Sequence, residues 1–225
     1  MKQIFLDTET TGLYPDQGHR IIEIAAIETV NRQLTGNHFH QYINPERDID
    51  PAAQEVHGIT LDFLQDKPLF ESIAEEFIAF IKDSELIIHN APFDVGFLNS
   101  ELGRLGLKPV HEVCGKITDT LKMAKDARPG QRNNLDALCR HFEIDNSRRT
   151  LHGALLDAEL LAEVYMALTR GQDSLMIDLD HEDAIHDTDI LSTNLNKLKV
   201  LFASAEECAE HIEYLQGLDA CEKTW

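Results

Sequence analysis

Residues 2–12 read KQIFLDTETTG, and this stretch decides both the fold and the position of the site. Its apolar run ends at Leu6 and predicts a buried strand. Asp7 and Glu9 follow at the end of that strand, and residues two apart in an extended chain point to the same side. Two carboxylates are therefore aimed at one spot, at the end of a central strand where open sheets place their sites.

The segments around this stretch predict a mixed α/β domain with helices packed on the sheet. We expect strands at residues 2–7, 20–30, 37–43 and 85–89, with a turn at 34–37. Apolar residues at helical spacing predict helices over residues 70–82, 92–105, 118–127, 134–142 and 153–169. Strands come first and then alternate with helices, which is the order of a mixed α/β domain.

Length and composition suit one domain with an appendage. The chain has 225 residues, of which 43% are hydrophobic. No apolar run reaches the ~18–20 residues that a membrane span needs. The first strand begins directly after the first residues, so we expect no signal peptide. The four cysteines form no CxxC pair and are expected to be reduced thiols. We therefore expect a cytoplasmic protein without a membrane span.

The net charge of −20 argues against broad electrostatic binding of nucleic acid. Half of that charge falls in residues 171–225, which hold 13 acids and 3 bases. Residues 173–189 contain seven acids and no Lys or Arg, so they predict a flexible linker. One stretch, residues 116–149, is locally basic; it is either a guide for a DNA backbone or an ordinary solvated surface.

The segment after the linker predicts a short amphipathic helix. Ser204 and Glu207 form a capping-box pattern, and Cys208, Ile212 and Leu215 then fall on one helical face. So short an element cannot bury its own apolar face, so we expect it to dock on a partner. The predicted organisation is a catalytic domain, a linker and a docking segment, at residues 1–171, 172–193 and 194–225.

Two further carboxylates occupy the ends of predicted elements. Asp94 follows the strand at 85–89, in the first turn of a helix, where a negative side chain is favoured. Asp157 lies on the helix that begins after His152. The two residues are five apart and would not share a helical face. We therefore place His152 just before or at the helix start and Asp157 inside the helix.

Four carboxylates in one pocket would repel one another without a counter-charge. Their oxygens suit Mg²⁺ or Mn²⁺ and not zinc. Two such ions ~3.5–4 Å apart can hold the attacking and leaving oxygens of a phosphoryl displacement. A magnesium site benefits from a separate general base, for which His152 is the candidate. A helix N-terminus disfavours the imidazolium form and so helps to keep this base neutral.

Each motif alone has a simpler interpretation, as a turn, a helix cap or an incidental pair. Together and in order, DTETTG, HNAPFD and HGALLD resemble the three motifs of the DEDDh exonuclease family. Asp7 and Glu9 match the first motif, Asp94 the second, and His152 with Asp157 the third. The resemblance implies a ribonuclease H-like fold, two divalent cations, and removal of 3′-terminal nucleotides as 5′-monophosphates.

Longer segments resemble one branch of that family, the proofreading subunits of bacterial replicative polymerases. They include residues 30–47, VHGIT at 56–60 and residues 132–165. The resemblance implies single-stranded 3′ ends of DNA as substrate, a polymerase subunit bound through residues 194–225, and room for a small theta-like subunit. The alternatives are a stand-alone nuclease acting on RNA ends or short oligonucleotides, and a mainly structural polymerase subunit.

Four further residues are candidates for substrate contact. Leu13 and Phe93 flank the motifs and could stack against the terminal base, although Phe93 could equally be a core aromatic. His57 could contact the terminal nucleotide or be a structural histidine. Asn90 could orient the substrate, but capping of the following helix is the stronger expectation.

Residues 172–177, QDSLMI, resemble the short clamp-binding motif of bacterial replication proteins. Gln172, Leu175 and Ile177 stand at the matching positions, with Ile177 in place of the usual terminal aromatic. A flexible peptide that must be ordered on binding is expected to bind a sliding clamp weakly. The alternative is that the two apolar side chains only close the end of the catalytic domain.

Overall fold

The computed structural model describes residues 2–147, 149, 151–170, 204, 205, 207 and 211. The chain divides into two compact units, residues 1–173 and 174–225. The predicted boundaries at 171 and 193 stay predictions.

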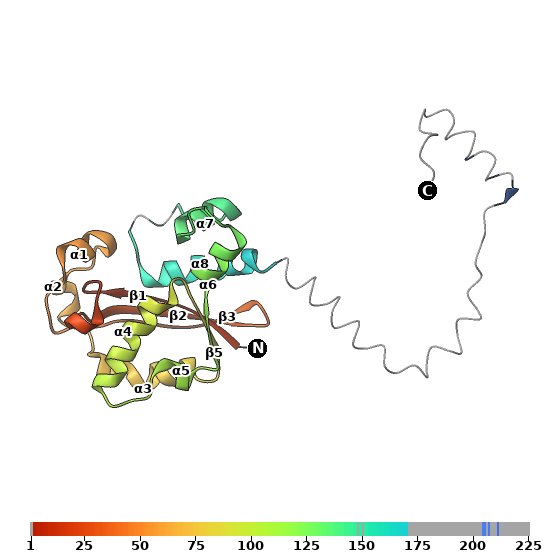
Figure 1. Ribbon diagram of the computed structural model, residues 1–225. Helices are drawn as coiled ribbons and strands as arrows, with labels where there is room; N and C mark the ends of the chain where they lie inside the picture. Colours follow the sequence, from red (N-terminus) through yellow and green to blue (C-terminus); the bar gives the residue numbers. More distant parts are fainter. Residues whose placement is uncertain are drawn as a thin grey trace, which may run out of the picture. The chain divides into compact units, whose positions relative to one another are not determined.

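The first unit is built on one five-stranded sheet with strand order β3-β2-β1-β4-β5. β1 pairs antiparallel with β2 and parallel with β4; β2–β3 is antiparallel and β4–β5 parallel. The sheet is therefore mixed, as the sequence predicts, and β1 lies at its centre (Figure 1). The strands are β1 (Lys2–Thr10), β2 (Ile21–Val30), β3 (Gln33–Tyr42), β4 (Glu85–Ile88) and β5 (Lys116–Asp119).

Helices cover both faces of the sheet (Figure 1). The long helices are α3 (Phe70–Ile81), α4 (Ala91–Arg104) and α8 (Ala154–Leu168). Two helices of eight residues, α6 (Thr120–Ala127) and α7 (Leu135–Phe142), lie between α4 and α8 in the sequence. Short elements are η1 (Pro15–Gln17), α1 (Pro51–His57), α2 (Leu61–Leu64) and α5 (Val110–Val113).

The alternation of β1 side chains divides the core between the two faces. Ile4 and Leu6 pack in the cluster that contains the apolar residues of α3 and α4. Phe5, which lies between them, packs in the cluster that contains residues of α7 and α8. Because β1 is buried on both faces, it reads as a continuous apolar run, and its ends are fixed relative to α4 and α8.

The predicted turn between β2 and β3 at residues 34–37 is wrong. The turn falls at Asn31 and Arg32, both with positive φ (51° and 64°), as a tight two-residue hairpin requires. Gly36 and its neighbours, whose composition suggested the turn, instead lie where the strand register shifts. There the Glu28 side chain accepts hydrogen bonds from Thr35 and Asn37.

The predicted helix at residues 118–127 begins later than expected. Residues 116–119 form β5, and α6 starts at Thr120 because the Asp119 side chain accepts hydrogen bonds from the backbone N–H groups of Leu121 and Lys122. β5, α1, α2 and α5 have no counterpart among the predicted elements. All four are short, and little apolar periodicity marks them.

The capping box predicted at Ser204 is present. The Ser204 backbone N–H donates to the Glu207 carboxylate at 2.8 Å, and the Glu207 N–H donates to Ser204 Oγ at 3.2 Å. The predicted clamp motif and most of the docking segment lie outside the described residues. No helix within the described part of the chain is both long and apolar enough to cross a membrane.

Candidate active site

The four predicted carboxylates converge beside the ends of the central strands β1 and β4. Asp7 and Glu9 lie on β1, and the parallel strand β4 ends beside them and leads into α4. Asp94 lies in the first turn of α4 and Asp157 in the first turn of α8, as the sequence predicts. Thr8 ties two of these elements together, because its Oγ1 donates a 2.7 Å hydrogen bond to Asp94 Oδ1.

These carboxylates are close enough to perturb one another. Burial and then the charges of Asp94, Glu9 and Asp157 raise the pKa of Asp7 well above its usual value. Burial and the charge of Asp157 raise the pKa of Glu9 to about 8. Burial raises the pKa of Asp94 to about 7, against the hydrogen bond from Thr8. Crowded acids of this kind need a counter-charge before all of them can ionise.

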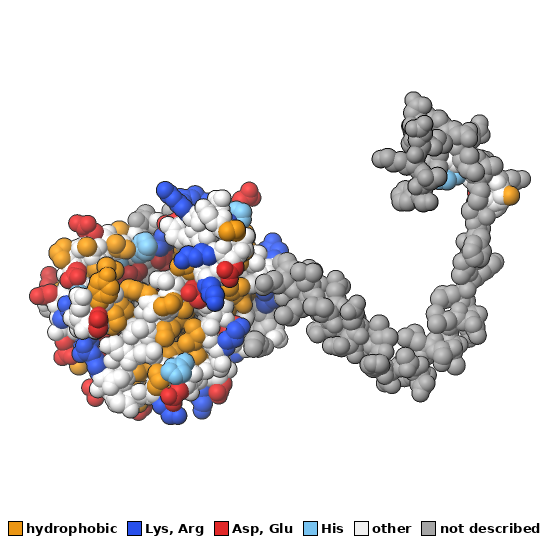
Figure 2. Space-filling view, viewed as in Figure 1, with side chains coloured by type: hydrophobic (Ala, Val, Ile, Leu, Met, Phe, Trp, Pro, Cys, Tyr) orange, Lys and Arg blue, Asp and Glu red, His pale blue; other side chains and the backbone are white. Residues whose placement is uncertain are grey.

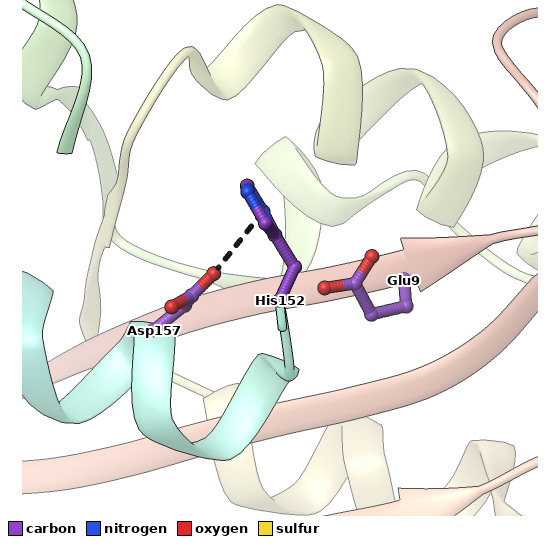
Figure 3. A group of neighbouring side chains, drawn as sticks. All are labelled: Glu9, His152 and Asp157. Carbon is purple, nitrogen blue, oxygen red and sulfur yellow. Dashed lines mark ion pairs between the residues drawn. The ribbon is translucent and has the colours of Figure 1, made fainter. Parts of the chain in front are cut away.

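His152 lies where the sequence predicts, directly before α8, and its side chain is half-exposed. Its Nδ1 is 3.6 Å from Asp157 Oδ2, and Glu9 points into the same space from β1 (Figure 3). Burial and then the charge of Arg149 lower the pKa of His152. The imidazole is thus biased toward its neutral form, which can accept a proton.

The donor set fits a divalent cation. Glu9, His152 and Asp157 each offer one ligand atom, and these atoms lie within 4.8 Å of one another. The neighbouring carboxylates Asp7 and Asp94 add negative charge to the same place. A group dominated by carboxylate oxygens suits hard cations such as Mg²⁺ or Mn²⁺.

Arg149 is a site residue that the sequence did not single out. Its side chain is 7% exposed, and its guanidinium donates to both oxygens of Asp157, at 2.5 and 2.7 Å. It also donates to Asp136 at 2.8 Å and lies 2.9 Å from His152 Nδ1. The sequence offered only its membership of the basic stretch, which does not distinguish it from its neighbours.

Glu23 is a second residue that sequence reasoning missed. It is directly opposite Glu9 in the β1–β2 pairing and is buried. One of its oxygens accepts from the backbone N–H of Ala154 at 3.2 Å, and the other lies 2.7 Å from His40 Nε2. Since Gly153 has no side chain to cap α8, Glu23 does so from the sheet and fixes the helix that carries Asp157. The available signal was an acid inside the apolar run at 21–27.

The four candidates for substrate contact lie in different environments. Leu13 is 65% exposed just after β1. The Phe93 ring is partly buried against the core and lies 5.0 Å from the Phe97 ring. His57 is buried; its Nδ1 accepts from Ile59 N–H, and its Nε2 has no partner within the described residues.

Asn90 is exposed and stands at the N-cap position of α4 in the left-handed region, with φ 69°. Its side chain makes no capping hydrogen bond, so the expected capping role is wrong. The backbone N–H of Asn90 instead donates to Asp119. This left-handed residue, two positions after the end of β4, turns the chain into α4 and so brings Asp94 to the site.

Comparison with known proteins identifies the family and the fold. The family model described as Exonuclease matches residues 4–165. The nuclease domain of 3′hExo, a DEDDh family member solved with rAMP bound, superposes with a TM-score of 0.63 at 22% identity, covering 76% of this chain and 92% of that chain. Fold and family together define a DEDDh exonuclease with a ribonuclease H-like fold, a metal-dependent class.

Curated relatives narrow the class further. The DNA polymerase III subunit epsilon of Rickettsia typhi is 53% identical over 223 residues, covering 97% of each chain. The subunit of the same name from Escherichia coli K12 is 49% identical over 220 residues, covering 93% of this chain and 90% of that protein. The chain therefore belongs to the bacterial DNA polymerase III epsilon family, the proofreading 3′→5′ exonucleases.

Proposed function

We propose that this chain removes mispaired 3′-terminal nucleotides from DNA by metal-assisted hydrolysis, with Asp7, Glu9, Asp94 and Asp157 as the metal ligands and His152 as the general base. The observation that carries the proposal is the convergence of these carboxylates from β1, α4 and α8, with raised pKa values for three of them. The family relation supports the direction of cleavage.

The protein's part is to bind, orient and take up a proton. Two divalent cations, Mg²⁺ or Mn²⁺, would supply the positive charge that a phosphodiester under attack requires. His152, biased toward its neutral form, would take the proton from the attacking water. Glu23 and Thr8 would keep the ligands in register, Glu23 by capping α8 and Thr8 by holding Asp94.

The terminal nucleotide is proposed to lie across the loop after β1 and the end of α1. Leu13 offers an exposed apolar surface there, and the unpartnered Nε2 of His57 offers a polar contact. Phe93 and Asn90, at the start of α4, complete the proposed contacts. The frayed strand would reach the site past the basic stretch, and Figure 2 shows Lys and Arg side chains over the α6–α7 part of the visible face.

Association with a replicative polymerase follows from the epsilon relation as a proposal. Residues 194–225 would bind the polymerase III alpha subunit, and Gln172, Leu175 and Ile177 would contact the sliding clamp weakly. A small theta-like subunit is a further proposed partner, and the cytoplasm is the proposed location. Tethering raises the effective concentration of such weak contacts, so the clamp contact would work only within the assembly.

The test is a nuclease assay on duplex oligonucleotides that differ only in a matched or mismatched 3′ end. With Mg²⁺ we expect faster release of 5′-monophosphates from the mismatched end, and with EDTA none from either. A matched RNA oligonucleotide separates proofreading from the stand-alone alternative. Asp157→Ala with Asp66→Ala as an exposed control separates site chemistry from general loss of acid. Equal cleavage in EDTA, or preference for RNA, would contradict the proposal.

A further inference from the structure

The observation that carries a further inference is the position of Arg149. A charged side chain is almost never buried unless it is paired, and that of Arg149 is 7% exposed. Among the described residues its hydrogen-bond partners are Asp157 of α8, Asp136 of α7, and His152 just before α8. A cation of the protein itself therefore lies among the groups proposed to bind metal.

The geometry of the contact between Arg149 and Asp157 determines whether a metal ion can share the Asp157 carboxylate. The Nε and Nη2 groups of Arg149 bind the two oxygens of Asp157 side by side, in the forked arrangement that matches a guanidinium to a carboxylate. A divalent cation that uses Asp157 as a ligand needs these same oxygens. The guanidinium and the ion therefore compete for Asp157.

A second arginine, Arg20, whose side chain is 16% exposed, shows what a purely structural pair looks like. Arg20 donates to both oxygens of Glu101 at 2.7 and 2.9 Å, and Glu101 also accepts from the Ile21 backbone. Neither residue is among the proposed ligands. Arg149 differs because its guanidinium spans two carboxylates, of which Asp136 is 38% exposed and lies outside the proposed ligand set. Asp136 can keep hold of Arg149 when Asp157 is given up.

We propose that Arg149 is a built-in counter-cation of the active site. Without a divalent ion it holds Asp157 and His152 in place and offsets the repulsion among the carboxylates. An entering ion displaces it from Asp157, and Arg149 stays attached through Asp136. Arg149 thereby weakens metal binding while stabilising the metal-free protein. This inference rests on the proposed metal site at Asp157.

A purely structural Arg149 and a competing Arg149 would respond to the same substitution with opposite changes in metal affinity. If Arg149 were only structural, Arg149→Gln would loosen the loop before α8 and weaken metal binding along with stability. If Arg149 competes with the ion, Arg149→Gln lowers the melting temperature in EDTA but binds Mn²⁺ more tightly. Arg149→Lys keeps the charge without the fork, so it should fall between wild type and Arg149→Gln.

The experiment is a Mn²⁺ titration of the full chain, followed by electron paramagnetic resonance, with melting curves in EDTA. We expect Arg149→Gln to bind Mn²⁺ at least about tenfold more tightly than wild type, or about 1.4 kcal/mol. Arg20→Gln, which breaks the partly buried forked pair with Glu101, should melt lower with unchanged affinity. If Arg149→Gln does not fold, the Arg149→Lys affinity decides on the same sign.

Mn²⁺ binding by the Arg149 variants that is equal to or weaker than that of wild type would overturn the proposed role of Arg149 as a counter-cation. Two other results would show that the proposed metal site itself is wrong, and the role of Arg149 with it. These are the absence of saturable Mn²⁺ binding by wild type, and Mn²⁺ binding by Asp157→Ala as tight as that of wild type.

Discussion

The two ends of the central strands treat buried carboxylates in opposite ways. At the start of β4, Glu85 is buried but accepts hydrogen bonds from Gln3 at 2.9 Å, Lys116 at 2.7 Å and Thr118 at 2.6 Å. Burial alone would raise its pKa, and these bonds outweigh burial and lower it. Glu85 thus has its full set of partners within the fold.

At the other end of the same strands, Glu9 and Asp94 have pKa values raised to about 8 and 7. Each has acids among its neighbours, and the nearby cation, Arg149, is engaged with Asp157. The comparison separates an acid whose charge the fold compensates, Glu85, from the proposed metal ligands, which lack such compensation and would need a bound cation.

The largest expected difference between the two ends is in activity. Asp157→Ala should lower Mg²⁺-dependent cleavage by at least about a thousandfold, because a metal contributes several kcal/mol to a phosphoryl transition state. Asp7→Ala should do the same, with the domain still folded by circular dichroism. Glu85→Gln is the matched control and should keep near-wild-type turnover. Substantial activity in either aspartate variant at saturating Mg²⁺ would remove it from the ligand set.

The next effect concerns His152. His152→Gln should lower the rate by roughly 10²–10⁴-fold, the usual contribution of a general base, with little change in Mn²⁺ affinity. Because burial and Arg149 lower its pKa below the ordinary value of 6.5, wild-type cleavage should rise with pH and level off at a lower pH than an ordinary histidine would give. The variant should lose that rise. A pH–rate profile unchanged by the substitution would exclude His152 as the base.

The placement of Asp7, Glu9, Asp94 and Asp157 in the candidate site could be predicted from sequence, because they stand near the end of a strand or in first turns of helices. Their elements are specified by local apolar patterns, so their meeting could be expected. The roles of Arg149 and Glu23 could not, because they exist only in the folded chain. Glu23 reaches across 131 positions to cap Ala154, and no local pattern encodes that contact.

The β2–β3 hairpin likewise depends on contacts that local sequence composition does not encode. Gly36 and its neighbours have stronger turn composition than Asn31 and Arg32, yet the turn falls at the earlier pair. Register in a half-buried hairpin is set by which side chains reach the core, and the bulge absorbs the extra residues. Composition alone indicated an irregularity near Gly36 but predicted a turn where the structure has a bulge.

A stability effect should appear at the acidic end as pH changes. Glu9 and Asp94 hold their protons in the folded protein at pH values where the unfolded chain has lost them. The unfolded state then binds fewer protons, so folding stability in EDTA should fall as pH rises from about 4.5 to about 8. Excess Mn²⁺ should flatten this decline. A melting temperature in EDTA that stays constant or rises with pH over this range would show that the carboxylates are not crowded in the folded protein.

The smallest effect is expected at the compensated end. Glu85→Gln should cost about 1–3 kcal/mol, because it weakens the hydrogen bonds of a buried acceptor. That corresponds to a fall in melting temperature of roughly 2–4 °C per kcal/mol for a domain of this size. The fall should be the same in EDTA and in Mn²⁺. A Mn²⁺-dependent difference would show that the two ends are coupled.

Whether the buried carboxylates form a crowded metal site is tested most directly by the melting temperatures of wild type and Asp94→Asn at pH 8, first in EDTA and then in excess Mn²⁺. Without metal, Asp94→Asn should melt higher, because it removes one of the mutually repelling charges. With metal, the order should reverse, because the wild type binds the ion more tightly and a ligand at ~100 times its dissociation constant stabilises by ~2.7 kcal/mol. A wild type that melts higher in EDTA, or an order unchanged by Mn²⁺, would show that these carboxylates do not form a crowded metal site.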